Sequence, residues 1–379
     1  MKKLLQINPV IRRNTSTGKI MQEIGELAMQ NGWESYIAYS KGRDGIMPCQ
    51  SQLVPVGSKL SVALHGLETR LLDRHGLGSR IATRRFISQI KKINPDIIHI
   101  HNIHGYFLNY RILFDYLSKC GKPVIWTVHD CWLYTGHCYY YSAAGCFKWK
   151  DGCGNCPQRA DFPKSYFIDR STKNYDDKAK AFNSMPKDKF LIAPVSEWIA
   201  SELRQSFLKD YEIRVFHNGI DTEAFKPQPT ADIREKYGLA DKSVILGLAS
   251  IWMKEKGLDD FVKMSSLTNE DEVIVLVGKM TPEQKAQLPK GDVTIARTEN
   301  MNELAQLYSA ATAFVNPTWQ DNYPTVNLES IACGTPVVTY RTGGSVEAVT
   351  EGVTGFVVEQ GDVDGLLAKV RQIASCGKN

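Results

Sequence analysis

Short apolar runs rich in β-branched residues recur along the first half of the chain. They occupy residues 4–8, 34–39, 97–101, 124–129, 190–195 and 214–216. Stretches with apolar positions at helical spacing, at residues 19–30, 80–93 and 108–119, lie between several of them. Buried strands that alternate with helices indicate a parallel sheet with crossover helices.

The second half repeats this pattern. Strands are predicted at residues 243–249, 272–277, 293–296, 313–316, 337–340 and 355–358, and helices at 258–266, 301–310, 326–333 and 363–374. The boundary is expected near residues 218–221, because the proline-containing stretch at 225–230 is typical of an extended connector. The pattern predicts an α/β fold of two doubly wound, Rossmann-like domains, 1–221 and 222–379, facing across a cleft where ligands bind.

Composition supports two globular domains and limits the compartment. The 379 residues are 43% hydrophobic and 23% charged, which excludes a disordered chain. No run approaches the roughly 18 apolar residues of a membrane span. Asn8-Pro9 interrupts the first apolar run, so we expect no signal peptide and a cytoplasmic protein.

The charge is divided unevenly between the two halves. Residues 1–222 hold 31 Lys and Arg against 20 Asp and Glu, and the remainder holds 15 against 21, so +11 and −6 sum to the net +5. A basic first half suits a membrane surface, nucleic acid or a phosphorylated substrate, and charge alone does not choose among them.

The clearest chemical signal lies at residues 316–347, NPTWQDNYPTVNLESIACGTPVVTYRTGGSVE. A helix is expected after Asp321 or Asn322 as cap, and its amino-terminal end favours an anion. Glu329 lies one or two turns into this helix, where its carboxylate can accept hydrogen bonds from both hydroxyls of a ribose. Gly343-Gly344 permit close approach of the backbone to a ligand. The alternative is a capped helix with a solvated glutamate and a glycine turn.

This segment resembles the nucleotide-sugar site of the retaining glycosyltransferases of family four, which have the GT-B fold. Their pattern is a Glu, seven residues, a second Glu, then Gly-x-Pro-Val-Val and Gly-Gly-x-x-Glu. Asp321 stands at the first carboxylate position and Glu329 at the second, with Glu347 at the end. The family's Gly-Arg-Leu-x-x-x-Lys-Gly element corresponds to residues 250–257, in which Lys256 matches, Ile251 replaces the arginine, and Lys254 is a second candidate cation.

Histidines gather where two strands of the first half are predicted to end. His99, His101 and His104 lie at the end of one strand, and His129-Asp130 lies at the end of the next. The alternatives are core histidines or a metal pair of His99 and His101. The resemblance implies that His101 or His104 contacts the transferred sugar.

The resemblance also implies a set of site residues. The catalytic residues are His101, His104, Lys256 and Asp321, and the donor-binding residues are Lys254, Asn322, Tyr323, Pro324, Thr325, Glu329, Gly343 and Gly344. The acceptor and cleft residues are Gly18, Asn102, Gly105, His129, Asp130, Ser196, Asn218 and Gly219. For Ser196 and for residues 218–221, a helix cap and a turn are the alternatives.

Five of the nine cysteines fall within residues 131–156. Cys138, Cys146, Cys153 and Cys156 predict a structural zinc site, with two disulfides or free thiols as the alternatives. The segment 129–138, HDCWLYTGHC, resembles a loop of the capsular-polysaccharide and colanic-acid branch of family four and is expected on the acceptor side.

Basic and apolar residues alternate at helical spacing between residues 70 and 92. A membrane-facing surface and a helix packed on its own domain are the two interpretations. The residues are Arg70, Arg74, Arg80, Arg84, Arg85, Lys91 and Lys92, together with Leu71, Leu72, Leu77, Ile81, Phe86, Ile87 and Ile90.

The resemblance to family four implies a retaining, metal-independent glycosyltransferase. It would move a sugar from a nucleoside diphosphate sugar to a hydroxyl of a lipid-linked polysaccharide precursor, without a cofactor for catalysis and without a nucleic-acid partner. A GT-B epimerase or phosphorylase is the alternative among enzymes, and a basic, zinc-containing nucleic-acid-binding protein is the alternative from another class. The family usually continues with a helix that crosses back onto the first domain, and after residue 374 we expect that crossing to be short or absent.

Overall fold

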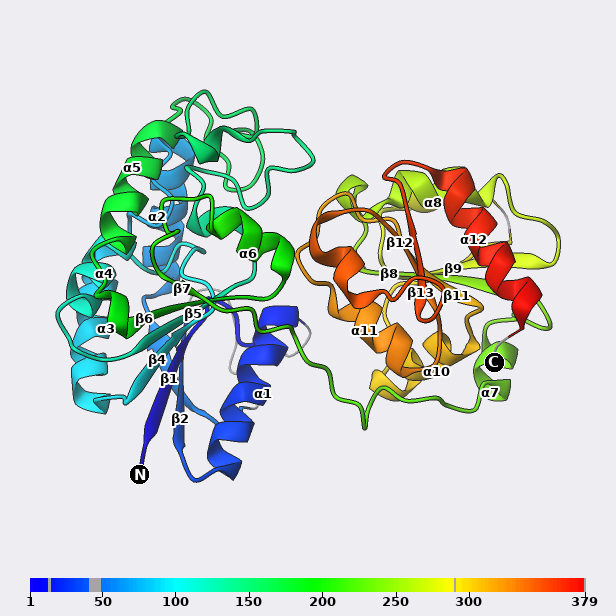
Figure 1. Ribbon diagram of the computed structural model, residues 1–379, viewed down its shortest axis with the longest axis horizontal. Coiled ribbons are helices and arrows are strands. Elements are labelled where there is room, and N and C mark those ends of the chain that lie inside the picture. The colour runs from blue at the N-terminus through cyan, green and yellow to red at the C-terminus, as the bar shows by residue number, and fades with distance from the viewer. Residues whose placement is uncertain (13–14, 41–48, 290, 378–379) are drawn as a thin grey trace. The chain divides into compact units, whose positions relative to one another are not determined.

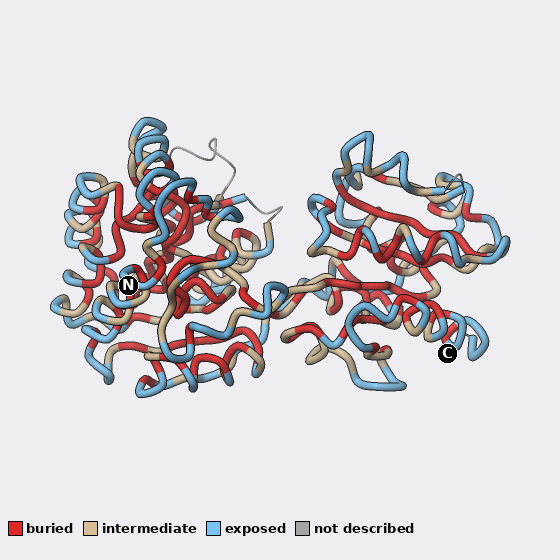
Figure 2. The backbone as a smooth tube through the Cα atoms, turned by 90° about the horizontal axis from the view of Figure 1, so that it is seen from above, coloured by how far each residue is buried: buried red, intermediate tan, exposed pale blue. Residues whose placement is uncertain are grey.

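The computed structural model describes residues 1–12, 15–40, 49–289 and 291–377. The chain divides into two compact units, Met1–His217 and Asn218–Asn379 (Figure 1). Buried segments run through the interior of each unit, and the loops around them are exposed (Figure 2). No helix among the described residues is long and apolar enough to cross a membrane.

Unit 1 is built on a parallel sheet with the strand order β3-β2-β1-β4-β5-β6-β7. Its strands are β1 (Lys3–Ile7), β2 (Glu34–Ser40), β3 (Gln52–Val56), β4 (Ile97–Ile100), β5 (Val124–Val128), β6 (Phe190–Pro194) and β7 (Glu212–Ile213). Its helices are α1 (Ser16–Gln30), α2 (Lys59–Leu72), α3 (Arg80–Ile93), α4 (Tyr110–Leu117), α5 (Ser171–Phe182) and α6 (Glu197–Leu203).

Unit 2 is built on a second parallel sheet, with the order β10-β9-β8-β11-β12-β13. The strands are β8 (Ser243–Ile251), β9 (Glu272–Lys279), β10 (Val293–Ile295), β11 (Ala313–Asn316), β12 (Val337–Tyr340) and β13 (Gly355–Val358). The helices are α7 (Ala231–Lys236), α8 (Leu258–Ser265), α9 (Pro282–Lys285), α10 (Met301–Ala310), α11 (Thr325–Ala332) and α12 (Val363–Cys376). Both sheets have the doubly wound order, which confirms the predicted fold class.

Strand and helix boundaries differ from the sequence prediction where tertiary packing overrides local preference. β3 contains Pro55, and this proline is tolerated because β3 is the edge strand and pairs only with β2. The strand predicted at residues 214–216 lies directly after β7, which is Glu212–Ile213. The N–H groups of Arg214 and Phe216 still donate to the oxygens of Ile192 and Pro194 on β6, at 3.0 and 2.9 Å. Helix α11 begins at Thr325 with Pro324 as its cap, so neither Asp321 nor Asn322 occupies the cap position.

A long loop between β5 and α5 includes the cysteine-rich segment and is attached to the unit by a buried lysine. Lys178, on α5, donates from Nζ to the carbonyl oxygens of Trp132 at 2.6 Å and Thr135 at 2.9 Å. Its ammonium also lies 3.5 Å from the centroid of the Trp132 ring. Burial lowers the pKa of Lys178 to about 7, although the neighbouring Cys153, Cys138, Asp130 and Asp73 oppose that shift. The lysine thus joins the start of this loop to helix α5.

We expect Lys178→Met to destabilise unit 1 by about 2–4 kcal/mol, because two buried carbonyl oxygens lose their donor. Denaturant unfolding measures this loss, and Lys173→Met, at an exposed position of the same helix, is the matched control. The pKa of Lys178 is lower in the folded chain, so the unfolded chain binds more protons between pH 7 and pH 10. Wild-type stability therefore rises with pH across that window relative to Lys178→Met. Equal free energies of unfolding for the wild type and Lys178→Met at every pH would contradict this role.

Candidate functional site

The loops that follow β8 and β11 in unit 2 are joined through one backbone carbonyl. The oxygen of Glu255 accepts hydrogen bonds from the Trp319 N–H at 2.9 Å and from the Thr318 hydroxyl at 3.2 Å. Gly257 lies in the left-handed region at φ 77°, and a Cβ there would stand 2.3 Å from the Pro317 oxygen. Only glycine allows this approach, which brings the two loops together at the carboxyl end of the sheet.

Lys256 and Asp321 meet where these two loops touch. Nζ of Lys256 lies 2.7 Å from Oδ2 of Asp321, and Oδ1 accepts from the Asn322 N–H at 2.9 Å. The two side chains are 39% and 18% exposed. A partly exposed ion pair contributes about 0–1 kcal/mol, so an anion of higher charge can compete with the carboxylate for Lys256.

Glu329, in the second turn of α11, is buried beside α10. The Tyr308 hydroxyl donates to its Oε2 at 3.3 Å. Burial, and after it the charge of Glu329, raises the pKa of Tyr308 well above its ordinary value, so the tyrosine remains a donor. The solvated glutamate considered as the alternative is wrong, because Glu329 is only 7% exposed.

A buried polar network that the sequence reasoning missed holds α11 against β11 and β12. Asn327 accepts from Asn316 Nδ2 at 2.8 Å and donates to the Ser345 oxygen at 3.0 Å. The hydroxyls of Thr339 and Ser345 lie 2.8 Å apart, and Thr339 also donates to the Asn316 oxygen at 2.9 Å. The only sequence signal is a polar residue in each of two apolar strands. The network fixes the helix that carries Glu329.

The other predicted donor-binding residues surround this helix start. Asn322 and Pro324 are buried, Tyr323 and Thr325 are half-buried, and Lys254 is exposed. The carbonyl of Tyr323 accepts from Asn218 Nδ2 at 3.1 Å, so Asn218 belongs to the same region of unit 2. Gly343 and Gly344 open the short helical segment Gly343–Ala348 after β12, with Gly343 at φ 49°.

The histidines of unit 1 form a chain at the ends of β4 and β5. His101 Nε2 lies 3.0 Å from Gln6 Oε1, and its Nδ1 lies 3.1 Å from His129 Nε2. Gln6 donates from Nε2 to the Met21 oxygen at 2.8 Å, so its Oε1 is the acceptor that faces His101. This assigns the His101 proton to Nε2 and makes Nδ1 the acceptor from His129. Both ring nitrogens of His101 are engaged within the unit.

Burial keeps these histidines neutral at pH 7. It lowers the pKa of His101 well below the ordinary value, with the charges of His99 and His129 adding to the effect. It lowers the pKa of His99 to about 3 and that of His129 to about 4. His99 Nε2 lies 2.8 Å from the Thr127 hydroxyl. In the described part of the chain no group of three or more His, Cys, Asp or Glu side chains is placed to hold a metal ion.

His104 has a different environment from His101. Its Nε2 lies 2.9 Å from Oδ2 of Asp130, whose Oδ1 accepts from the Trp132 N–H at 2.9 Å. Burial opposes ionisation of Asp130, but the charge and hydrogen bond of His104 and the bond from Trp132 lower the pKa of Asp130 below its ordinary value. The carboxylate thus accepts a hydrogen bond from His104 and orients its ring. The geometry favours His104 over His101 for contact with a substrate.

The remaining acceptor-side predictions include residues with a clear local structural role. A Cβ on Gly18 would lie 2.3 Å from the Arg12 oxygen, so the start of α1 requires glycine there. Ser196 is buried and caps α6 by accepting from the Ile199 N–H at 3.2 Å. Gly105, at φ 122°, turns the chain next to His104, and Asn102 is half-buried. Gly219 is exposed, with open space around it.

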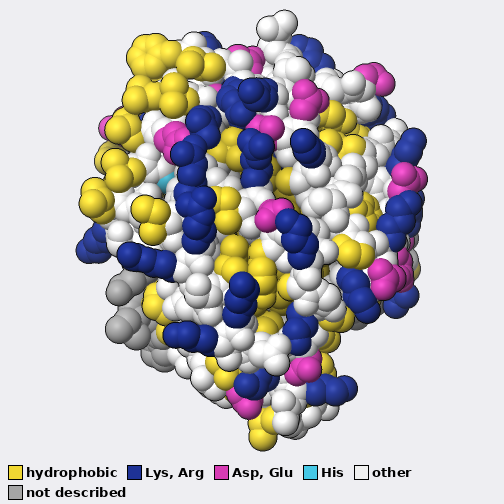
Figure 3. Space-filling model, turned by 90° about the vertical axis from the view of Figure 1, so that its left-hand side faces the viewer, with side chains coloured by type: hydrophobic (Ala, Val, Ile, Leu, Met, Phe, Trp, Pro, Cys, Tyr) yellow, Lys and Arg dark blue, Asp and Glu magenta, His cyan; other side chains and the backbone are white. Residues whose placement is uncertain are grey.

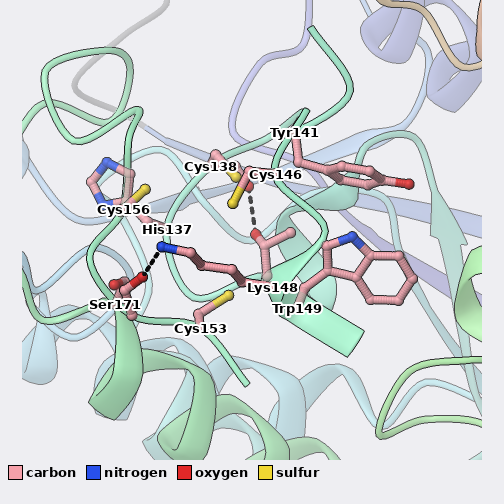
Figure 4. A pocket seen from close by; sticks show the side chains of 11 residues that line it. His137, Cys138, Tyr141, Cys146, Lys148, Trp149, Cys153, Cys156 and Ser171 are labelled. Carbon is pink, nitrogen blue, oxygen red and sulfur yellow. Dashed lines mark hydrogen bonds between the residues drawn. The ribbon is translucent and has the colours of Figure 1, made fainter. Parts of the chain in front are cut away.

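The four cysteines predicted to bind zinc line one small cavity of about 20 Å³ in unit 1 (Figure 4). None of the cysteines in the described residues is part of a disulfide. A hydrogen bond from Cys138 lowers the pKa of Cys156 to about 7. The charge of His137 acts in the same direction, and burial opposes the shift. The thiols gather as the sequence predicts, but in the described residues they do not converge on one point as metal ligands. The zinc site stays a prediction.

Comparison with known proteins places this geometry in a class. Residues 242–376 match the family model described as "Glycosyl transferases group 1", and residues 21–224 match "Glycosyltransferase Family 4". The fold resembles sucrose-phosphate synthase from Thermosynechococcus elongatus, with a TM-score of 0.71, 16% identity, and coverage of 99% of this chain and 90% of that one. It also resembles Anabaena HepE in complex with UDP and glucose, with a TM-score of 0.68, 15% identity, and coverage of 99% and 90%.

Two curated relatives agree with these matches. The putative colanic acid biosynthesis glycosyl transferase WcaC of Escherichia coli K12 is 24% identical over 357 residues, which cover 91% of this chain and 85% of that protein. A GDP-mannose-dependent phosphatidylinositol monomannoside mannosyltransferase of Mycolicibacterium smegmatis is 29% identical over 222 residues, covering 52% of this chain and 58% of that protein. The fold and the matched models define a glycosyltransferase of the GT-B type. Because the family-four model covers more than half of the chain, this protein belongs to glycosyltransferase family 4.

We predict about one zinc ion per chain in protein purified without a chelator, bound by the four thiols of the cavity. Elemental analysis measures the metal, and a Cys153→Ser/Cys156→Ser variant is expected to lose it. Cys120→Ser/Cys376→Ser, whose thiols lie outside the cavity, is the matched control. Wild-type protein that contains no zinc and in which all four thiols react with a thiol reagent would refute the site.

Proposed function

We propose that this protein is a retaining glycosyltransferase that transfers a sugar from a nucleoside diphosphate sugar to a hydroxyl of a lipid-linked polysaccharide precursor. Unit 2 would bind the donor and unit 1 the acceptor. The similarity to WcaC along 91% of the chain supports a role in the biosynthesis of cell-surface polysaccharide. The proposal includes a cytoplasmic location at the inner face of the membrane, where such a precursor is accessible.

The observation that carries the proposal is the grouping in unit 2 of a cation, a helix start and a buried carboxylate. Lys256 stands at the carboxyl end of β8, and α11 begins a few residues after its partner Asp321. The ammonium and the positive end of the helix suit a diphosphate, and Glu329, four residues into the helix, suits the ribose hydroxyls. Lys254, exposed two residues before Lys256, is a second cation for the same anion.

In the proposed reaction the bond between the anomeric carbon and the diphosphate breaks first. The departing diphosphate gathers negative charge, which Lys256 and the start of α11 stabilise, and stabilisation of this kind often accounts for most of an enzyme's rate enhancement. The acceptor hydroxyl then bonds to the same face of the carbon, and its proton passes to a phosphate oxygen of the leaving group. No step is assigned to a metal ion or to a cofactor.

His104 and Asp130 would act on the acceptor side of the reaction. The sugar resembles an oxocarbenium ion in the transition state, and neutral hydrogen-bonding groups near it avoid charge repulsion. His101 and His129 add no positive charge behind His104, because burial keeps both rings uncharged at pH 7. Their hydrogen bonds to each other and to Gln6 hold the end of β4 that leads to His104.

A GT-B epimerase or phosphorylase would share much of this geometry. An epimerase converts a donor without an acceptor, whereas a transferase forms a new glycosidic bond and releases a nucleoside diphosphate. Analysis of products with and without a lipid extract therefore separates these reactions.

We expect one class among UDP-, GDP- and dTDP-sugars to raise the melting temperature of the wild-type protein. Glu329→Ala should remove most of that shift and raise the donor KM about tenfold to a hundredfold, because two ribose hydroxyls lose a buried acceptor. Thermal shift and steady-state kinetics measure both effects. The control is Glu303→Ala, a buried glutamate on α10 paired with Lys236. Unchanged donor binding in Glu329→Ala would refute the ribose role.

Lys256 and Asp321 are expected to have opposite effects on binding of a nucleoside diphosphate. Lys256→Ala should weaken it and lower kcat/KM about a hundredfold or more, because the leaving group loses its cation. Asp321→Asn should strengthen it and increase its salt dependence, since the carboxylate no longer competes for Lys256. Lys263→Ala, at an exposed pair on α8, is the control. Weaker product binding in Asp321→Asn would show instead that Asp321 holds Lys256 in place.

A further inference from the structure

Helix α2 of unit 1 has its apolar and polar faces reversed relative to an ordinary surface helix. Leu60, Leu64, Leu67 and Leu71 recur at a spacing of three and four residues and so share one face. Their exposed fractions are 69%, 57%, 50% and 39%. The buried positions of the same helix are His65, Gly66 and Thr69. The leucine ridge, as we call these four residues, therefore faces away from the core.

Specific hydrogen bonds hold the helix in this orientation. The Nε2 atom of His65 accepts from the Gly76 N–H at 3.1 Å and the Gly78 N–H at 3.2 Å, and its Nδ1 lies 2.9 Å from the Ser79 hydroxyl. Turning the leucines inward would expose this histidine and leave the two N–H groups without their acceptor. The outward leucine ridge is thus a property of the folded unit.

A loop between the cysteine-rich segment and α5 extends the apolar surface. Tyr166, Phe167 and Ile168 are 56%, 74% and 42% exposed. The Tyr166 N–H donates to the Arg70 oxygen at 2.9 Å, which fastens this loop to the last turn of α2. Two segments about a hundred residues apart thereby form one exposed apolar surface, larger than isolated surface leucines would make.

Positive charge surrounds this surface. Residues 59–93 contain eight Lys or Arg and two Asp or Glu. One carboxylate, Asp73, is buried against His137 at 2.7 Å, and the other, Glu68, pairs with Arg74 at 3.0 Å and Arg80 at 3.6 Å. The bond between Glu68 and Arg80 places the start of α3 beside α2. On this side of unit 1 a band of lysines and arginines runs beside hydrophobic side chains at the upper left (Figure 3).

The arrangement favours one of the two sequence interpretations of residues 70–92, a helix packed on its own domain. Leu77, Phe86 and Ile90 are buried, so α3 packs its main apolar positions on its own unit. The apolar contact surface lies instead on α2 and residues 166–168, while α3 supplies exposed basic residues, among them Arg84 and Arg85.

We propose that the leucine ridge and the loop at 166–168 insert into the headgroup region of an anionic lipid bilayer, with the basic residues of α2 and α3 on the phosphates. A bilayer offers apolar depth and negative charge together, which matches both features of the surface. A second copy of this chain would bring the same positive charge to the same place and be repelled. Docking on the membrane would bring the enzyme to the lipid-linked acceptor of the proposed function. The argument for docking itself uses only the properties of this surface.

The test is sedimentation of the full chain with vesicles, without donor or acceptor. We expect binding to vesicles that contain phosphatidylglycerol and at least tenfold weaker binding to pure phosphatidylcholine. Leu60→Ser/Leu64→Ser/Leu67→Ser should reduce binding at least tenfold at every salt concentration. Arg84→Gln/Arg85→Gln should reduce it mainly at low salt, because the electrostatic part is screened.

The matched control is Leu27→Ser/Leu267→Ser/Val353→Ser, which removes exposed apolar side chains elsewhere and should bind as wild type does. Circular dichroism and melting verify that each variant is folded. Equal vesicle binding by wild type and the leucine variant would overturn the proposal. So would a wild-type dimer, seen by light scattering, that binds no vesicles and dissociates in the leucine variant. Transfer to a water-soluble acceptor tests the proposed function separately and should be unchanged in the leucine variant.

Discussion

An unpaired polar group is costly to bury, and that constraint determines how the strand ends of this protein are built. In unit 1 the rings of His101 and His129 bond to each other and to Gln6. In unit 2 the side chain of Asn327, on α11, donates hydrogen bonds to the backbone and side-chain oxygens of Ser345. Each candidate site is therefore supported by buried polar side chains, which cannot change conformation without losing their hydrogen-bond partners.

In each unit the charge at the candidate site differs from the charge of the unit as a whole. Unit 1 is rich in basic residues, yet at the ends of β4 and β5 burial keeps His101 and His129 uncharged. Unit 2 is acidic overall, yet the loop after β8 presents Lys256, balanced by Asp321. An anion of higher charge can displace the carboxylate from Lys256.

Much of the fold could be predicted, because a buried parallel strand leaves a clear apolar run. β11, β12, β13 and α3 have the predicted limits. Helix α2 was missed, because its apolar face lies outside and its buried face is His65, Gly66 and Thr69. The motif residues Lys256, Asp321 and Glu329 were predicted from their resemblance to a family, whereas their partners Tyr308 and Asn327 belong to no local pattern.

By itself, the sequence determined the alternation of strands and helices, the division into two α/β halves, the family, and the clustering of thiols in one loop. These properties depend on residues close together in the chain. Only the tertiary structure decided that Asp321 pairs with Lys256, that His101 is engaged on both nitrogens, and that the leucines of α2 face outward. Each of these depends on contacts between residues far apart in the chain, and a one-dimensional pattern does not encode which distant polar groups satisfy each other.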